Sequence, residues 1–239
     1  MKVLPVPVRE DNYAYLLIDE ASQSAAAVDP YDVPKVKAAA ENAGVQIVAG
    51  ITTHHHFDHS GGNQVFASTY PDVPIYGGSE RVPALTNLVK DKEEFSIGAI
   101  NVKCLATPCH TQDSICYYAT DANSTHPGGT TVYNGHEYTK GNLAFAKSVD
   151  PENPALARLE GIVHKNKITT GLTTIADEKQ WNPFMRLDSA SIQKATGGGE
   201  MSAVMDELRD QKNNYRGEWP ALSCKRYRRK GTLDVFGCI

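Results

Sequence analysis

Residues 51–63 read ITTHHHFDHSGGN and place four histidines and an aspartate within six consecutive positions. A lone histidine is usually a core or surface residue, but an H-x-H-x-D-H run after an apolar stretch is much harder to produce by chance. Imidazole and carboxylate groups together suit zinc or iron. The run lies inside the chain, which argues against an affinity tag. It predicts a metal site.

The apolar stretch before the histidines, VQIVAGIT at residues 45–52, is typical of a buried strand. Residues two apart on a strand point to the same side. We therefore expect His54 and His56 to face a cleft and His55 to face away from it. The chain then turns into a helix predicted over residues 63–68, and this turn can aim Asp58 and His59 at the same space.

Further ligands must come from distant parts of the chain. His110 lies in ATPCHTQDS and His136 in YNGHEYT, each just after a predicted strand. Site residues of layered α/β folds gather at such strand-to-loop transitions, so both histidines are candidate ligands. His126 and His164 lack this context and are interpreted as surface residues.

Alternating strands and helices over the first part of the chain predict a layered α/β domain. Strands are expected at the N-terminus and over residues 12–19, 24–28, 45–52, 73–76, 99–106, 114–119 and 131–134. Proline at its start and Gly44 after its end mark a helix at residues 34–43. Later segments are helical, with helices expected over residues 143–149, 154–163, 189–195 and 200–215. The last has one apolar face, formed by Met201, Val204, Met205 and Leu208.

Composition limits the function classes. The formal net charge of −4 gives no global attraction to nucleic acid or an anionic membrane. No apolar run approaches the ~20 residues needed to span a bilayer, and the first residues lack the pattern of a signal peptide. Five irregularly spaced cysteines without a C-x-x-C pair favour a reduced compartment. We expect a cytoplasmic protein, with a mitochondrial location left open.

Several motifs together indicate a family. THHHFDHSGGN resembles the signature of the metallo-β-lactamase superfamily, and TPCHT, GHEYT, NPFMR and LRDQKN narrow the resemblance to glyoxalase II, the hydroxyacylglutathione hydrolases. The resemblance implies an α/β fold, an αββα sandwich over residues 1–141, followed by a helical glutathione-binding domain over residues 142–215. Residues 216–239 do not match and are predicted to be a disordered tail.

The resemblance also implies a metal centre and a substrate. One metal ion would be held by His54, His56 and His110, and a second by Asp58, His59 and His136. Zinc is expected, with iron or manganese as alternatives. The substrate would be a glutathione thioester, S-D-lactoylglutathione, hydrolysed by a monomeric enzyme to D-lactate and glutathione in methylglyoxal detoxification. A metal ion lowers the pKa of a bound water to roughly 7 and so supplies a nucleophile at neutral pH. Asp58 is predicted to orient that nucleophile.

By the same resemblance, Tyr138 would contact glutathione, and Arg209 and Lys212 would hold one of its carboxylates. The spacing is consistent with this, since residues three apart share one face of a helix. Arginine can grip a carboxylate through two parallel hydrogen bonds, and lysine adds a point charge. The alternative interpretation is that Arg209 and Lys212 form a basic edge of the helix that is exposed to solvent.

The sequence departs from the family between TPCHT and GHEYT. The family has a TGDTLF-like motif there, whose aspartate bridges two metal ions, and a loop that helps to hold glutathione. Here residues 121–130 read as a polar loop with a Pro-Gly-Gly turn. The sandwich is therefore expected to be incomplete, with apolar surface exposed on one sheet, and Asp121 is a weak substitute for the missing carboxylate.

This departure leaves alternatives open. Two dications without a bridging carboxylate repel each other strongly, but three histidines still provide a mononuclear zinc site with an open position. One alternative is a catalytically inactive variant that binds zinc or glutathione conjugates. Another is a mononuclear-iron relative such as a persulfide dioxygenase, which lacks the helical domain.

Overall fold

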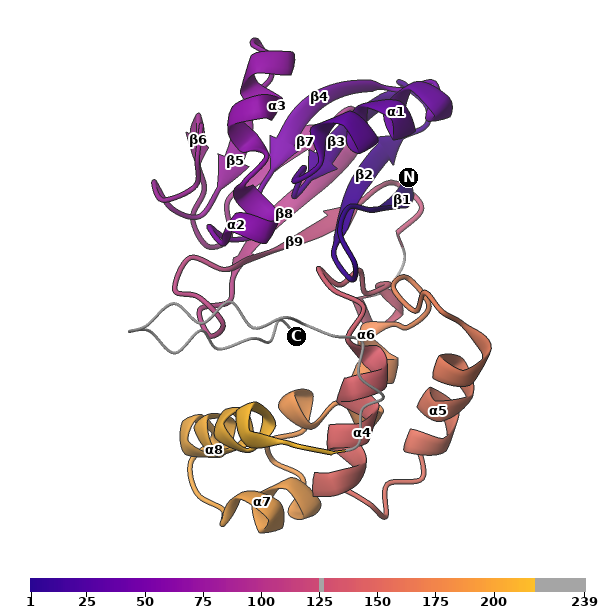
Figure 1. Ribbon diagram of the computed structural model, residues 1–239, viewed down its shortest axis with the longest axis vertical. Coiled ribbons are helices and arrows are strands. Elements are labelled where there is room, and N and C mark those ends of the chain that lie inside the picture. Colours follow the sequence, from indigo (N-terminus) through magenta and orange to yellow (C-terminus); the bar gives the residue numbers. More distant parts are fainter. Residues whose placement is uncertain (125–126, 218–239) are drawn as a thin grey trace. The chain divides into compact units, whose positions relative to one another are not determined.

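The computed structural model describes residues 1–124 and 127–217 (Figure 1). The chain divides into two compact units, Met1–Thr125 and His126–Ile239. The predicted tail at residues 216–239 falls outside the described residues from residue 218 onward, and so does the surface interpretation of His126. No helix of the described residues is long and apolar enough to cross a membrane.

The first unit contains a six-stranded sheet in the order β1-β2-β3-β4-β5-β6. Its strands are β1 (Lys2–Pro7), β2 (Tyr13–Asp19), β3 (Ser24–Val28), β4 (Gln46–Ile51), β5 (Ile75–Gly77) and β6 (Asn87–Leu88). The first three pair antiparallel, and β3 to β6 pair parallel. Parallel neighbours need a crossover connection, which α1 provides between β3 and β4. The strands expected here are confirmed, and only the two-residue β6 was not predicted.

Helix α1 (Val33–Ala43) has well-defined ends. The Asp32 side chain accepts a hydrogen bond from the backbone N of Lys35, and Gly44 adopts φ 67° just beyond the last turn. A side chain with a Cβ disfavours that left-handed conformation, so glycine ends the helix here. The structure confirms the predicted helix. Two further helices, α2 (Phe57–Ser60) and α3 (Asn63–Thr69), connect β4 to β5, and α3 matches the helix predicted after the histidine run.

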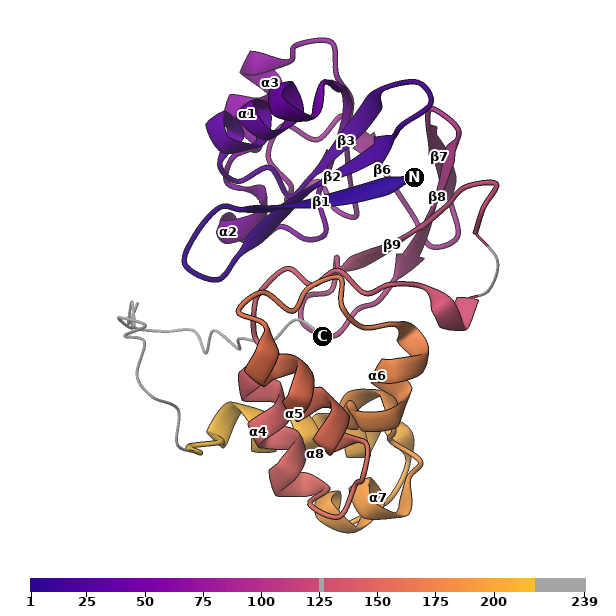
Figure 2. The same ribbon diagram turned by 90° about the vertical axis from the view of Figure 1, so that its right-hand side faces the viewer.

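A second, three-stranded sheet is formed by β7 (Glu94–Ile97), β8 (Ile100–Ala106) and β9 (Ile115–Thr120), all antiparallel. Figure 2 shows the layers of this unit, with α1, α2 and α3 on one side of the six-stranded sheet and the three-stranded sheet on the other. Leu17, Ala26, Ile51, Ile100 and Val102 fill the core between the sheets. A second core lies under the helices. Burial on both faces explains why β2 is buried along its whole length.

The outer face of the three-stranded sheet carries mainly polar side chains. Along β8, buried Ile100 and Val102 alternate with Asn101 and Lys103. Both of these bind Glu94 of β7, at 3.0 Å and 3.1 Å respectively. Among the described residues of this unit, no helix follows β9. The sandwich is incomplete as predicted, but the exposed apolar surface expected on this sheet is small, because polar pairs occupy much of it.

The second unit is helical, with two small cores. Its helices are α4 (Thr139–Val149), α5 (Leu156–Lys165), α6 (Ile175–Trp181), α7 (Ala190–Thr196) and α8 (Met201–Asn214), with short 3-10 turns at Pro127–Gly129 and Pro183–Met185. Four of these helices were predicted. Helix α6 was not, although Thr174 and Asp177 form a capping box at its start. On α8, Val204 and Leu208 are fully buried while Met201 is exposed, so the apolar face is shorter than predicted.

The strand expected over residues 131–134 is wrong. Thr131 forms only an isolated bridge with Thr174. The neighbouring backbone bonds, Val132 N to Thr173 O at 2.9 Å and Gly171 N to Val132 O at 3.0 Å, hold this extended segment against a loop. Without a second strand beside it, an apolar segment cannot extend a ladder, whatever its propensity.

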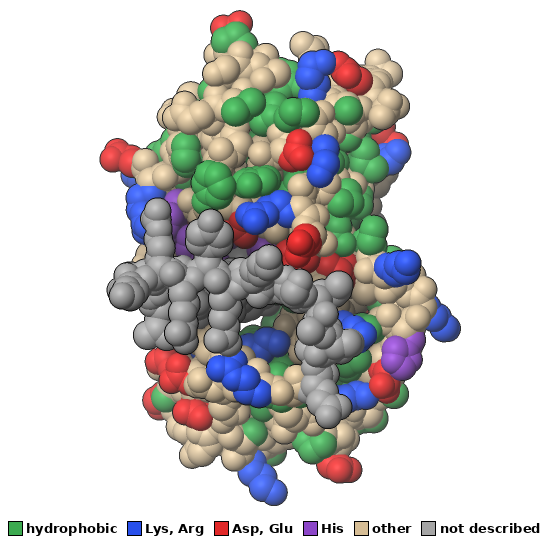
Figure 3. Space-filling view, viewed as in Figure 1, with side chains coloured by type: hydrophobic (Ala, Val, Ile, Leu, Met, Phe, Trp, Pro, Cys, Tyr) green, Lys and Arg blue, Asp and Glu red, His purple; other side chains and the backbone are tan. Residues whose placement is uncertain are grey.

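The described surface mixes charges of both signs. On the face seen in Figure 3, Lys and Arg side chains alternate with Asp and Glu in both units, and no continuous basic stripe is seen among the described residues. This mixture is consistent with the small net charge of the chain.

Candidate metal site

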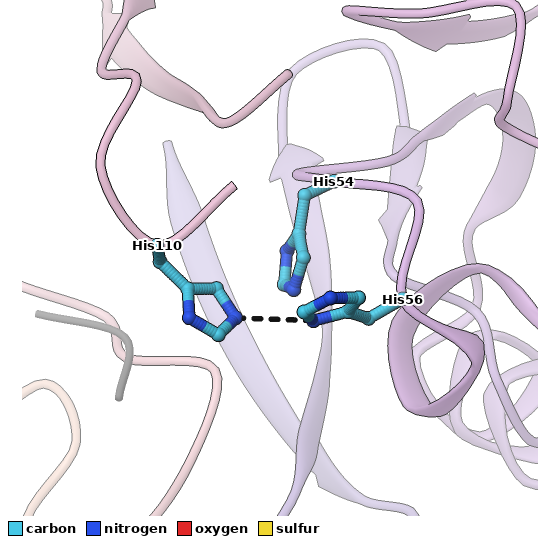
Figure 4. A group of neighbouring side chains, drawn as sticks. All are labelled: His54, His56 and His110. Atoms are coloured by element: carbon cyan, nitrogen blue, oxygen red, sulfur yellow. Dashed lines mark hydrogen bonds between the residues drawn. The ribbon is translucent and has the colours of Figure 1, made fainter. Parts of the chain in front are cut away.

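Three histidines from two distant segments converge in the first unit. The candidate ligand atoms of His54, His56 and His110 lie within 4.8 Å of one another. Their ring centroids are 4.8–4.9 Å apart, and His110 Nε2 lies 3.1 Å from His56 Nδ1 (Figure 4). Strand β4 ends at Ile51, so His54 and His56 follow the strand rather than lie on it. They still face the same space, because the loop turns directly into α2 with His56 as its N-cap.

The chemistry of His54 fits a bound cation. The side chain is buried, its Nδ1 lies 3.0 Å from Thr53 Oγ1, and its Nε2 has no hydrogen-bond partner among the described residues. Burial is the main cause that lowers the pKa of His54 to about 3, with a smaller contribution from His59. Burial also lowers the pKa of His56. The neutral imidazole is the form that binds a metal ion, and three such ligands leave an open position for catalysis.

His55 does not join the group of three. Its Nδ1 lies 2.7 Å from Asp113 Oδ1, and its backbone N donates to Asp113 Oδ2 at 2.9 Å. The His55 ring is thus bound to Asp113, although its centroid lies 4.9 Å from that of His56. His55 stays outside the group of three, but the prediction that it faces away is not confirmed.

Asp58 and His59 lie beside the group of three. The His59 ring centroid is 4.3 Å from that of His54, and His59 Nε2 is 3.8 Å from Asp58 Oδ2. The same Asp58 oxygen accepts a hydrogen bond from Asn12 Nδ2 at 3.1 Å. The first unit by itself thus gathers five of the six predicted ligands in one cluster.

Asp29 was not predicted as a site residue, yet it organises this cluster. Its Oδ2 is 2.8 Å from His59 Nδ1, and its carboxylate also accepts hydrogen bonds from Thr53 N and Thr53 Oγ1. Burial disfavours charge on both side chains, but their mutual attraction outweighs it, lowering the pKa of Asp29 and raising that of His59. A carboxylate that holds one ring nitrogen fixes which nitrogen is left for a metal ion. The signal that could have identified Asp29 in the sequence is an acidic residue directly after a buried strand. That strand is β3, which pairs parallel with β4.

His136 belongs to the second unit. Its ring stacks on that of Tyr138, with centroids 4.6 Å apart and planes 8° apart. Its role as a metal ligand stays a prediction. Asp121, the weak substitute for a bridging carboxylate, accepts a hydrogen bond from the Met1 amine at 2.8 Å. Over residues 1–124 and 127–217, no carboxylate joins the group of His54, His56 and His110.

Two of the three predicted substrate-binding residues of the second unit lie at the start of α4. Tyr138 is the N-cap of that helix, and Lys212 Nζ on α8 donates to Gly141 O at 3.3 Å. Burial lowers the pKa of Lys212 to about 8, and its ammonium lies 5.2 Å from the Phe145 ring centroid. A helix N-terminus already favours negative charge, so an ammonium beside it makes the position suited to an anion. Arg209, one turn earlier on α8, is half-buried.

Comparison with known proteins covers both units. A family model described as the metallo-beta-lactamase superfamily matches residues 16–137, and one described as the hydroxyacylglutathione hydrolase C-terminus matches residues 137–215. The ETHE1 crystal structure from Myxococcus xanthus is similar in fold, with a TM-score of 0.57 at 21% identity, covering 90% of this chain and 93% of that one.

Curated relatives are similar over nearly their whole length. A probable hydroxyacylglutathione hydrolase of Schizosaccharomyces pombe is 39% identical over 253 aligned residues, covering 89% of this chain and 98% of the relative. The cytoplasmic hydroxyacylglutathione hydrolase of Arabidopsis thaliana is 34% identical over 258, covering 91% of this chain and 100% of the relative. Both alignments are longer than the 239-residue chain, so these relatives contain positions that this chain lacks.

Proposed function

The chain belongs to the hydroxyacylglutathione hydrolase family, within the metallo-β-lactamase superfamily, and we propose that it hydrolyses a glutathione thioester, S-D-lactoylglutathione, to D-lactate and glutathione. Beyond family membership, the observation that carries the proposal is the convergence of His54, His56 and His110, with one buried ring nitrogen lacking any described partner.

We propose zinc as the ion held by these three histidines, with iron and manganese as alternatives. When bound, the ion supplies Lewis-acid activation of water and of the thioester carbonyl. The chain holds His54 neutral by burial and holds Asp58 in place through Asn12. The Asp58 carboxylate would accept a hydrogen bond from the attacking water and orient it toward the carbonyl carbon. A thiolate leaves readily, so the leaving group needs little help from an acid.

Asp58, His59 and His136 are proposed ligands of a second ion, in keeping with the family. Asp29 supports this role for His59 because its contact with Nδ1 at 2.8 Å fixes the orientation of the ring. We propose that Tyr138, Arg209 and Lys212 recognise the glutathione part of the substrate. Lys212 and the first turn of α4 together favour a carboxylate.

We also propose that the protein is cytoplasmic and monomeric. The location is supported by the name of the Arabidopsis relative, which refers to the cytoplasm.

The experiment that tests the function is direct. Purified protein is supplied with zinc and S-D-lactoylglutathione, and the release of glutathione thiol is followed beside a His54→Ala control. Elemental analysis of the same sample counts the bound ions. We expect zinc-dependent release that the control lacks. Equal release from both proteins contradicts the assigned site.

A second candidate function is binding without turnover. It is favoured by the aligned positions that this chain lacks and by the absence, among the described residues, of a carboxylate within the group of three histidines. Calorimetry with a glutathione conjugate distinguishes the two, because binding without thiol release would select this candidate.

A further inference from the structure

Asp113 lies on the loop that carries His110 and holds the segment that carries His54 and His56. One of its oxygens is 2.7 Å from His55 Nδ1, and the other accepts from the backbone N of His55 at 2.9 Å. The Asp113 side chain is 7% exposed and that of His55 15%. A carboxylate that accepts two hydrogen bonds from one residue restricts both the distance and the orientation of the two segments.

A second contact joins the same two segments. The backbone N of Ile115 donates to Thr53 O at 2.9 Å. Within the loop, Thr107 N donates to Ser114 O at 2.9 Å, and the hydroxyl groups of Thr111 and Ser114 lie 2.8 Å apart. His110 therefore sits in a loop that is closed at its base and tied to the neighbouring segment by Asp113.

The partner segment is itself held firmly. Ser60 Oγ donates to His55 O at 2.8 Å, and Thr53 binds the buried Asp29 through its backbone N and its hydroxyl group. The Asp113 carboxylate thus joins the His110 loop to a backbone that is fixed on its other side. His55 lies between His54 and His56, so its position constrains both.

We propose that Asp113 is a positioning residue, which sets the place of His110 relative to His54 and His56 and so prepares the three rings for one metal ion. This inference rests on the proposed function, because it concerns the ion that those histidines would hold. Asp113 bonds to His55 and not to any of the three, so it acts through the backbone. Without Asp113, the His110 loop would have to become ordered when the metal ion binds. That ordering costs free energy and lowers the metal affinity.

The main experiment measures zinc affinity by competition with a chelator. The variants are Asp113→Ala, which removes both acceptors, and Asp113→Asn, which keeps one oxygen. Glu94→Gln is the matched control, because Glu94 also accepts from two side chains but lies on the outer face of the three-stranded sheet. We expect the zinc dissociation constant to rise about 10–100-fold for Asp113→Ala, as when an outer hydrogen-bond partner of a metal site is lost. A smaller rise is expected for Asp113→Asn, and none for Glu94→Gln.

Two further readouts separate positioning from general stability. Thermal unfolding of the metal-free variants measures the structural part of the role, and the visible spectrum of the cobalt-loaded protein reports how the three rings are arranged. We expect an altered spectrum even at saturating cobalt. A lower unfolding midpoint with unchanged zinc affinity and an unchanged spectrum overturns the proposal.

Two outcomes remain to be distinguished. If Asp113→Ala does not fold, zinc affinity is measured on Asp113→Asn and His55→Ala instead. His55→Ala removes the ring contact with Asp113 and keeps the backbone contact. Unchanged zinc affinity in both variants overturns the proposal. Wild-type protein that binds neither zinc, iron nor manganese overturns the proposed function itself. Tight wild-type binding matched by Asp113→Ala overturns only the role of Asp113.

Discussion

The three histidines of the first unit and the basic pair of the second are assembled in different ways. His56 and His110 meet across 54 residues of sequence, and buried carboxylates hold the segments around them. Arg209 and Lys212 are three residues apart on the single helix α8. The first arrangement depends on hydrogen bonds made by residues that are not themselves proposed ligands of an ion, and the second depends on helix geometry and burial. The two sites should therefore respond differently to substitution and to pH.

The largest effect is expected for His54→Ala. It removes a buried ring nitrogen from the group of three, which should abolish tight zinc binding and reduce thiol release more than about 100-fold, exceeding the loss of an outer partner. Metal counting and a thiol assay measure this. His164→Ala, on the exposed side of α5, serves as the control and should retain both properties. Full metal content in His54→Ala would contradict the assignment.

The next largest effect is expected for Asp29→Ala. This change leaves Thr53 and His59 without their buried acceptor. Breaking a buried charged pair costs about 3–5 kcal/mol of stability, measurable by urea unfolding. Asp29→Asn keeps one acceptor oxygen and should lose less. If the urea concentration at the unfolding midpoint is the same for Asp29→Ala and the wild type, the buried carboxylate does not organise the cluster.

A moderate effect is expected from the titration of Lys212, whose pKa burial lowers to about 8 from 10.5. The charged form would bind the substrate carboxylate, so kcat/KM should fall as the pH rises through about 8. Lys212→Arg stays charged and should not show this fall. The same fall in both proteins would assign the titration to another group.

The same lysine predicts a change in stability of the opposite sign. Between pH 8 and 10.5 the unfolded chain still holds the proton that the folded protein has lost. The free energy of unfolding should therefore rise with pH over this window. Urea unfolding at several pH values measures the rise, and Lys212→Met should reduce it. An equal rise in the variant would exclude Lys212 as its source.

The smallest effect is expected for Asp121→Asn. Asp121 binds the Met1 amine and lies outside the group of three histidines, so its charge should not matter to a metal ion. Metal content should be unchanged, and thiol release should stay within about twofold, as for most surface substitutions. A clear loss of metal would make Asp121 the substitute for the missing bridging carboxylate.

Much of the fold follows from local patterns. The prolines and glycines around α1, the apolar run of β4 and the buried positions of α8 each mark an element that the structure contains. The missed elements have weaker local signals: β6 has two residues, β7 and α2 have four each, and α6 begins at a threonine cap inside a polar segment. Residues 131–134 show the opposite error, since strand-like residues form no ladder without a neighbouring strand.

The histidine run by itself determined that this chain has a metal site, because the ligand types and their spacing are properties of consecutive residues. The motifs around it determined the family. Only the tertiary structure decided that His110 joins His54 and His56 and that Asp29 and Asp113 hold the segments carrying them. It also decided that Asp121 does not join the three histidines and binds the Met1 amine instead. These contacts join residues far apart in the chain, and their energies arise from burial, which no local pattern records.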